Sequence, residues 1–191
     1  MNTAVENAVY EMLDAAGVDW QDDNFADTPK RFATWVKPLA VPVDQVTVKD
    51  ILSAKFSEEH KEMVAVTNIR VHAACAHHLL PFTGVAHVGY LPGKYVVGIS
   101  KLARLAQYIA NRFTLQERVT TQIADALMTH LEADGAIVVV KAVHNCMAVR
   151  GVREPYAETV TSATRGLFRE NANGCKTEFL SLIPSTIGGS L

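Results

Sequence analysis

The chain has 191 residues, of which 49% are hydrophobic and 20% are charged, enough for one globular core with extensions. Its formal net charge of −2 gives no general attraction for nucleic acid or for an anionic membrane, so we expect neither as a partner. Because no apolar stretch approaches the roughly 20 residues of a membrane-spanning helix, and the N-terminus has no secretory pattern, we expect a soluble cytoplasmic protein.

The first third of the chain has helical signals. Apolar residues at helical spacing predict a helix over residues 3–17. A hydroxyl followed by proline predicts that a second helix begins at Thr28, and a later proline predicts that it ends at Pro38. A short helix is expected over residues 48–56. We therefore interpret residues 1–62 as an N-terminal helical extension.

From Met63 onward the pattern changes to the alternation typical of strands. The order of elements is strand, strand, helix, helix, strand, strand, which indicates an α+β fold with an antiparallel four-stranded sheet and two helices packed on one face. We assign residues 63–183 to this domain and residues 184–191 to a C-terminal tail. The predicted ranges are 64–75 and 84–91 for strands, a helix capped by Ser100 and one over 115–131 that Gly135 ends, and strands over 136–143 and 159–168.

Cysteine and histidine occur together in two clusters far apart in the sequence. Cys75 and His78 are three residues apart, and His144 and Cys146 form the second cluster. Zinc binds thiolate sulfur and imidazole nitrogen tetrahedrally, and a local ligand pair completed by a remote residue is a common arrangement. The alternative is that the cysteines are small buried apolar residues and the histidines are ordinary core or surface groups. The residue types alone leave both interpretations open.

Cationic residues near predicted helix starts could hold an anionic substrate. Ser100 and Lys101 offer a hydroxyl, free backbone N–H groups and an ammonium at the beginning of one helix. Arg104 follows one turn later, and Arg118 and Arg150 could converge from elsewhere. Each of these could instead be a solvated surface charge.

Seven segments between Cys75 and Ile183 form a specific pattern in a fixed order. They are Cys75-Ala76-His77-His78-Leu79-Leu80-Pro81-Phe82, Gly98-Ile99-Ser100-Lys101-Leu102-Ala103-Arg104, Gln116-Glu117-Arg118, His144-Asn145-Cys146-Met147, Arg150-Gly151-Val152-Arg153, Thr161-Ser162-Ala163 and Glu178-Phe179-Leu180. With these segments, the stretch from Cys75 to Ile183 resembles the GTP cyclohydrolase I family. The N-terminal part agrees more loosely, through Asp27-Thr28-Pro29-Lys30-Arg31. The resemblance implies the tunnelling fold and a homodecameric ring with active sites between subunits.

The resemblance also implies a zinc site and two catalytic histidines. Cys75, His78 and Cys146 would be the Zn²⁺ ligands, with a fourth position left for a water whose pKa zinc lowers to about 7. His77 would donate the proton that neutralises the opening ring nitrogen. His144 would lie beside the ribose and assist later proton transfers.

Substrate recognition is implied at a second group of residues. Glu117 would accept the two adjacent N–H donors of guanine, although a carboxylate in the first turn of a helix is by itself more often a dipole partner. Gln116 and Ile99 would line the same pocket. The implied contacts to the triphosphate are Ser100, Lys101, Arg104, Arg118, Arg150 and Arg31.

The implied activity is hydrolytic opening of the guanine imidazole ring of GTP, giving 7,8-dihydroneopterin triphosphate and formate. This is a first step toward either tetrahydrofolate and other pterins or 7-deazaguanines such as queuosine. The chain departs from the family pattern at Ala76, where a glutamate is usual, and at Thr34, where a lysine is usual. These departures motivate an alternative, a non-catalytic zinc-containing purine-nucleotide binding module of the same fold. A pterin synthase of this fold is a third hypothesis, but such enzymes bind zinc through histidines only.

Overall fold

The structure is a computed structural model that describes residues 3–184, so the predicted tail lies outside the described residues except for Pro184. Contacts divide the chain into two compact units, Met1–Val41 and Pro42–Leu191. Residues 42–62, which we assigned to the N-terminal extension, belong to the second unit. Within the described residues, none of the helices has the length and apolar character that crossing a bilayer requires.

The first unit consists of two helices that pack against each other, α1 (Ala4–Ala15) and α2 (Thr28–Leu39). Thr3 caps α1, where its hydroxyl accepts the N–H of Glu6. The predicted end of the second helix was wrong, because Pro38 lies inside α2 and the helix continues to Leu39. Proline has a φ compatible with a helix and removes only one intrahelical hydrogen bond, which a last turn tolerates.

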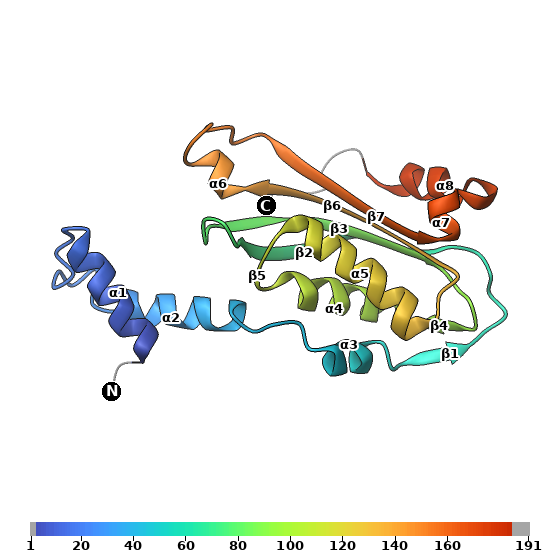
Figure 1. Ribbon diagram of the computed structural model, residues 1–191, viewed down its shortest axis with the longest axis horizontal. Coiled ribbons are helices and arrows are strands. Elements are labelled where there is room, and N and C mark those ends of the chain that lie inside the picture. The colour runs from blue at the N-terminus through green and yellow to red at the C-terminus, as the bar shows by residue number, and fades with distance from the viewer. Residues whose placement is uncertain (1–2, 185–191) are drawn as a thin grey trace. The chain divides into compact units, whose positions relative to one another are not determined.

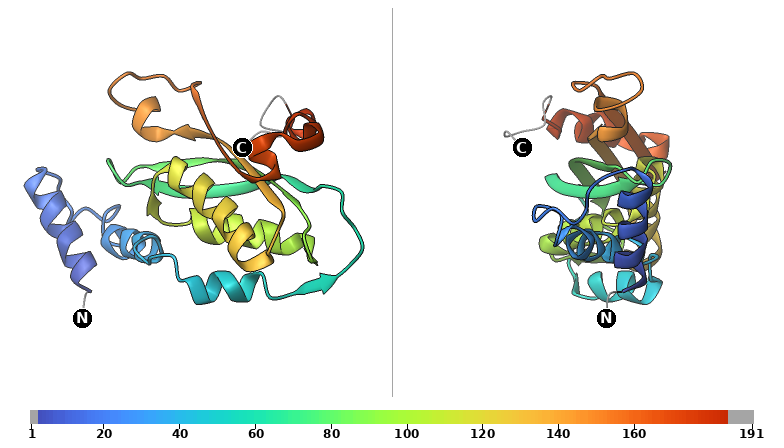
Figure 2. Two further views of the ribbon diagram at one scale, coloured as in Figure 1. Left: turned by 45° about the vertical axis from the view of Figure 1, so that its right-hand side comes forward. Right: turned by 90° about the vertical axis from the view of Figure 1, so that its left-hand side faces the viewer.

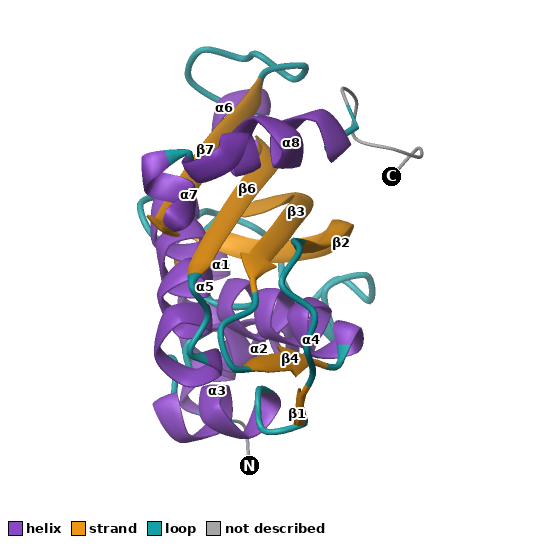
Figure 3. Ribbon diagram, turned by 90° about the vertical axis from the view of Figure 1, so that its right-hand side faces the viewer, coloured by secondary structure: helices purple, strands orange, loops and turns teal. Residues whose placement is uncertain are grey.

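The second unit is built on a sheet whose strand order is β5-β2-β3-β6-β7 (Figures 1 and 3). The four long strands pair antiparallel, as predicted. The short β5 adds a parallel pairing beside the end of β2, which the sequence did not predict. The strands are β2 (Val64–Cys75), β3 (Pro81–Leu91), β5 (Phe113–Thr114), β6 (Gly135–His144) and β7 (Glu158–Gly166).

Two helices cover one face of this sheet, α4 (Ile99–Ala110) and α5 (Gln116–Leu131). They lie side by side, with α4 against β2 and α5 against β6 and β7 (Figure 2). This confirms the predicted α+β arrangement. Alternate strand residues and the inner faces of both helices form the main core, where each fully buried aliphatic side chain contributes about 1.5–3 kcal/mol. Core members include Val71, Ala86, Val88, Val138, Val140, Leu102, Leu105, Ile109, Ile123 and Leu127.

Two residues predicted to mark helix ends do not do so, although the helix predicted over 115–131 does end at Leu131. Gly98 is the N-cap of α4, and Ile99 is already helical, so Ser100 lies inside the first turn and does not cap the helix. The helix α5 ends at Leu131, where Glu132 caps it in a left-handed conformation, and Gly135 begins β6. In both places the helix boundary lies before the residue that was expected to mark it.

The opposite face of the sheet is covered by α7 (Leu167–Glu170), η1 (Ala172–Gly174) and α8 (Cys175–Leu182). Phe168 and Phe179 pack there against apolar residues of β6. A Cβ on Gly89 would lie 2.6 Å from the Phe179 ring, so only glycine lets the ring lie on the strand. The predicted strand over 159–168 was too long, because Gly166 has a positive φ and ends β7.

The segment before the sheet also differs from the prediction. The helix expected over 48–56 is α3 (Gln45–Ile51), which begins earlier because the Asp44 carboxylate accepts the N–H groups of the first turn. Its predicted last residues instead form β1 (Lys55–Ser57), which pairs antiparallel with β4 (Tyr95–Val97). A three-residue strand depends on its distant partner, so local periodicity does not reveal it.

Candidate metal centre and substrate site

The two cysteine and histidine clusters meet at one end of the sheet. Cys75 is the last residue of β2, and Cys146 lies in α6 (Asn145–Ala148), directly after β6. The strand between them, β3, begins at the same end, where Phe82 is in register with His144. One ligand atom each from Cys75, His78 and Cys146 lies within 4.8 Å of the others. The tertiary structure therefore assembles the predicted ligand set.

A tight turn after β2 brings His78 back over Cys75. The carbonyl of Cys75 accepts the N–H groups of His78 and Leu79, and its own N–H donates to the carbonyl of Leu80 at 2.8 Å. Leu79 takes a left-handed conformation with φ of 56°. This backbone places the His78 Nδ1 atom 3.8 Å from the Cys75 Sγ atom.

This donor set fits zinc. Bond lengths of about 2.3 Å to sulfur and 2.0–2.1 Å to nitrogen put tetrahedral ligand atoms roughly 3.5–3.8 Å apart, close to the Cys75–His78 separation. Burial, and next the neighbouring Cys75 thiol, raise the pKa of the Cys146 thiol. Two thiolates whose sulfur atoms lie within 4.8 Å of each other repel unless a cation lies between them, so the cluster favours a divalent ion.

His144 is clamped beside this cluster. Its ring stacks on Phe82, with centroids 4.4 Å apart and planes 10° from parallel. Its Nε2 atom lies 2.8 Å from the Oε1 atom of Gln116. Burial lowers the pKa of His144, while the charge of Glu117 opposes that shift. The ring is therefore held in place by Phe82 against one face and by Gln116 at one edge.

The predicted base-recognition residues occupy different environments. Gln116 is only 1% exposed, and its amide is directed into the protein. Glu117, the next residue in the first turn of α5, is exposed. Ile99 is 69% exposed at the start of α4. Of the three, the structure places Glu117 and Ile99 where a ligand can reach them.

The predicted phosphate contacts are spread over three helices and the loop after α6. Ser100, Lys101 and Arg104 lie in the first turns of α4, whose free N–H groups favour anions. The other three predicted phosphate contacts are exposed: Arg118 in α5, Arg150 just after α6, and Arg31 in the first unit, where it pairs with Asp27 at 3.2 Å.

The predicted proton donor His77 lies exposed in the turn after β2, with its ring centroid 6.1 Å from that of His78.

The structure adds residues that the sequence analysis did not identify. Phe82 supports His144, and Thr120 and Thr161 join the hydrogen-bond network around Gln116. Thr120 lies four residues after Gln116, on the same face of α5, which was an available signal. Phe82 and Thr161 belong to matched segments but carry no chemical pattern of their own.

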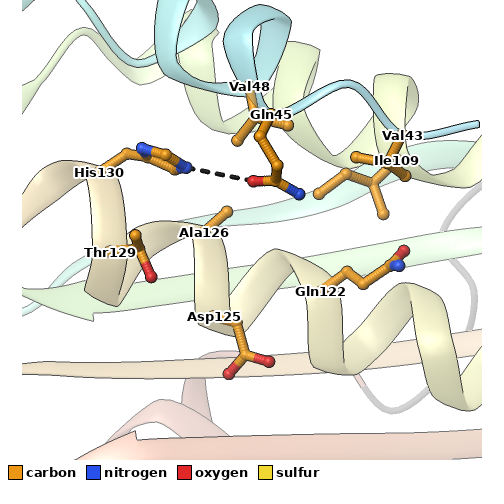
Figure 4. A pocket seen from close by; sticks show the side chains of 9 residues that line it. All are labelled: Val43, Gln45, Val48, Ile109, Gln122, Asp125, Ala126, Thr129 and His130. Carbon is orange, nitrogen blue, oxygen red and sulfur yellow. Dashed lines mark hydrogen bonds between the residues drawn. The ribbon is translucent and has the colours of Figure 1, made fainter.

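A separate pocket of about 160 Å³ lies between α3, α4 and α5 (Figure 4). His130 Nε2 and Gln45 Oε1 are 3.3 Å apart at one side of it. The Gln122 side chain points into the pocket, and its buried Oε1 atom has no partner among the described residues. The pocket is lined by Val43, Gln45, Val48, Ile109, Gln122, Asp125, Ala126, Thr129 and His130.

A family model and the curated relatives of this sequence agree on one family. The family model described as GTP cyclohydrolase I matches residues 5–184. Similar curated proteins, each named GTP cyclohydrolase 1, come from Thermobifida fusca (48% identity, covering 87% of this chain and 81% of the relative), Corynebacterium glutamicum strain R (48%, 92% and 90%) and Desulforamulus reducens (47%, 94% and 95%).

Among solved structures, an archaeosine synthase QueF-Like in the apo form is similar, with a TM-score of 0.47 and 16% identity over 56% of this chain and 97% of that chain. The family match spans nearly all of the described residues, and the matches to the curated relatives cover most of this chain and most of each relative. This chain belongs to the GTP cyclohydrolase I family.

Proposed function

We propose that the chain is a zinc-dependent GTP cyclohydrolase I that opens the guanine imidazole ring of GTP, giving 7,8-dihydroneopterin triphosphate and formate. The observation that carries the proposal is the convergence of Cys75, His78 and Cys146 within 4.8 Å, beside His144, in a member of this family. The product serves either tetrahydrofolate and other pterins or 7-deazaguanines.

Cys75, His78 and Cys146 would hold the metal. When bound, zinc supplies the Lewis acidity that makes water nucleophilic at neutral pH. His77 is exposed in the same turn and is free to approach the substrate. It would donate the proton that neutralises the ring nitrogen as the C8–N bond breaks, so that the leaving nitrogen departs as an amine.

Glu117 would select the base. Guanine presents two adjacent N–H donors, which one ionised carboxylate accepts together, whereas adenine lacks this pair and would leave the carboxylate without partners. Ile99 is exposed and would lie against the ring system. The triphosphate would be held by charge-assisted bonds from Ser100, Lys101, Arg104, Arg118, Arg150 and Arg31.

A nucleotide-binding module without catalysis is the second candidate. The specific observation behind it is Ala76, which is exposed in the turn between Cys75 and His77, where the family usually has a carboxylate. Restoring that group by Ala76→Glu measures its contribution. A rise in turnover identifies Ala76 as a loss of catalytic power, and unchanged turnover means that this chain works without the carboxylate.

The test is direct product detection. Zinc-loaded protein is incubated with GTP, and formate is measured together with neopterin fluorescence after oxidation. We expect equal amounts of both products, with ATP giving neither. GTP binding without either product, in a sample with full zinc occupancy, supports the binding module and overturns the proposed activity.

We further propose a homodecameric ring in the cytoplasm. Among the described residues, β7 pairs only with β6, and β2 pairs on its outer side only through β5 at residues 74–75. Two different open edges on one chain favour head-to-tail pairing, which closes as a ring. Light scattering after size-exclusion chromatography measures the copy number, and a monomer at micromolar concentration contradicts the proposal.

A further inference from the structure

The side chain of Gln116 has a hydrogen-bond partner for both ends of its amide. Its Nε2 atom lies 3.0 Å from the carbonyl oxygen of Val140 and 2.9 Å from that of Thr159, with Thr161 Oγ1 at 3.2 Å. Its Oε1 atom lies 2.8 Å from His144 Nε2. Since the residue is 1% exposed, no atom of this amide is left for a ligand.

The orientation of the amide follows from its partners. Two of the three atoms around Nε2 are backbone carbonyls of β6 and β7, which accept hydrogen bonds and cannot donate them. Rotating the amide by half a turn would place Oε1 against the two carbonyl oxygens. All three atoms only accept hydrogen bonds, so no bond could form there. Nε2 therefore faces the strands, and Oε1 faces His144.

The two threonines fix the direction of the remaining bonds. Thr120 Oγ1 donates its single hydrogen to the carbonyl of Gln116, at 2.8 Å. The 2.6 Å contact between Thr120 and Thr161 must therefore use the Thr161 hydrogen, so Thr161 Oγ1 is left to accept from Gln116. The Thr120 and Thr161 hydrogens each have one assigned acceptor, the two hydrogens of Gln116 Nε2 are shared among three acceptors, and the network ties α5 to β6 and β7.

This arrangement determines which nitrogen of His144 carries hydrogen. Because Oε1 of Gln116 only accepts, Nε2 of His144 must be the N–H donor, and in the neutral ring Nδ1 then holds the lone pair. None of the hydrogen bonds between described residues uses Nδ1. The stack on Phe82 blocks one face of the ring and opposes rotation out of this position.

We propose that Gln116 is a positioning residue that holds His144 as the Nε2–H tautomer, with Nδ1 open to the substrate, and that it makes no contact with guanine. The inference rests on the proposed function, because it names the atom through which His144 accepts or returns protons in that reaction. It also assigns base recognition at this turn of α5 to Glu117 and separates it from Gln116.

The test is the Gln116→Met variant, which keeps the length of the side chain and removes the amide. With zinc content matched to wild type, we expect kcat to fall about 10- to 100-fold with KM for GTP within twofold, as for loss of a group that orients another. Gln122→Leu is the matched control, because it removes another largely buried amide from α5 on the side of the separate pocket. Its kcat and KM should equal those of wild type.

A second variant and a second readout guard against simple misfolding. Thr161→Val removes one hydroxyl of the network and is expected to lower kcat by less than Gln116→Met does. Solid-state ¹⁵N NMR of histidine-labelled protein, with the His144 signal assigned by its loss in His144→Asn, should show the Nε2–H tautomer in wild type. In Gln116→Met it should show a mixture of tautomers.

Three outcomes overturn the inference. They are a rise in KM with unchanged kcat, unchanged kinetics in Gln116→Met, and a wild-type His144 that carries its hydrogen on Nδ1. These are distinguishable from failure of the proposed function, which would appear as a wild-type protein that forms neither formate nor the pterin. The NMR result does not require turnover and stands in either case.

Discussion

Buried polar side chains of the second unit differ according to where they lie. In the first turns of α5, every polar side-chain atom of Gln116 and Thr120 has a partner, and the network extends to β6 and β7. Further along the same helix, the buried Oε1 atom of Gln122 has no partner among the described residues, and neither has the buried Nε2 atom of His87 in β3. An unsatisfied buried group costs about 1–3 kcal/mol, whereas a satisfied one contributes about 1 kcal/mol.

The difference indicates which polar groups are held in place and which are tolerated. A complete network has one low-energy arrangement, so it fixes the side chains that belong to it. Among the described residues, Gln122 Oε1 and His87 Nε2 make no hydrogen bond that would fix their side chains.

The largest effect is expected at the metal ligands. Cys146→Ser replaces a soft thiolate by a hydroxyl, so we expect bound zinc to be lost and turnover to fall more than about 100-fold, beyond what loss of a supporting residue costs. Metal analysis and the formate assay measure both. Cys175→Ser is the control, since Cys175 is buried under the other face of the sheet. Full zinc content in Cys146→Ser would remove this residue from the ligand set.

Base recognition should show the next largest effect. Glu117→Gln places an NH₂ group opposite a guanine donor, and we expect KM for GTP to rise about 10- to 100-fold, as for loss of a hydrogen bond to a charged group. Steady-state kinetics measure it. Glu178→Gln changes another exposed first-turn carboxylate, in α8, and should leave KM unchanged. Equal KM values in both variants would show that the base is read elsewhere.

His87 should make stability depend on pH. It is 1% exposed, its Nδ1 atom accepts the N–H of Asn68 at 3.3 Å, and burial, with a smaller effect of Lys141, lowers its pKa from 6.5 to about 4. The unfolded chain therefore binds more protons between pH 4 and 6.5, and stability is lost as the pH falls through that window, by up to about 3 kcal/mol.

The His87→Asn variant tests this dependence. Asparagine keeps an acceptor for the Asn68 N–H and has no titrating group. We expect wild type to lose more thermal stability than the variant when the pH is lowered from 7.5 to 4.5, as measured by Tm in scans at matched zinc concentration. Parallel Tm profiles for the two proteins would show that His87 does not titrate in this window.

The smallest effect is expected at Gln122. Replacing it by leucine removes the orphaned oxygen and fills part of the apolar wall, so we expect unchanged stability or a gain of up to about 1 kcal/mol. Gln116→Met, by contrast, removes the amide that bonds the carbonyls of Val140 and Thr159 and the His144 ring, and should cost about 1–3 kcal/mol. Denaturant titration of both variants measures the difference. An equal loss of stability in Gln122→Leu and Gln116→Met would show that the hydrogen-bonded Gln116 amide is no more stabilising than the Gln122 amide.

Periodicity in the sequence was sufficient for the four long strands and the two covering helices, whereas the metal ligand set was predicted through the family resemblance. Alternating residues such as Val71 and Val138 mark a strand with one buried face wherever it pairs. Cys75 and His78 form a local pair of a kind that zinc binds when a remote ligand joins it, but spacing alone left an ordinary structural role for these residues equally open. These features depend on residue type and on neighbours a few positions away.

The remaining features depended on contacts between distant segments. β1 and β5 are too short to show a pattern, and they exist because β4 and the end of β2 supply their hydrogen bonds. The role of Gln116 was likewise hidden, because glutamine is equally suited to bind a base or a histidine. Only the packing of α5 over β6 and β7 brings its amide to two backbone carbonyls and the His144 ring, and burial there leaves those partners as its only ones.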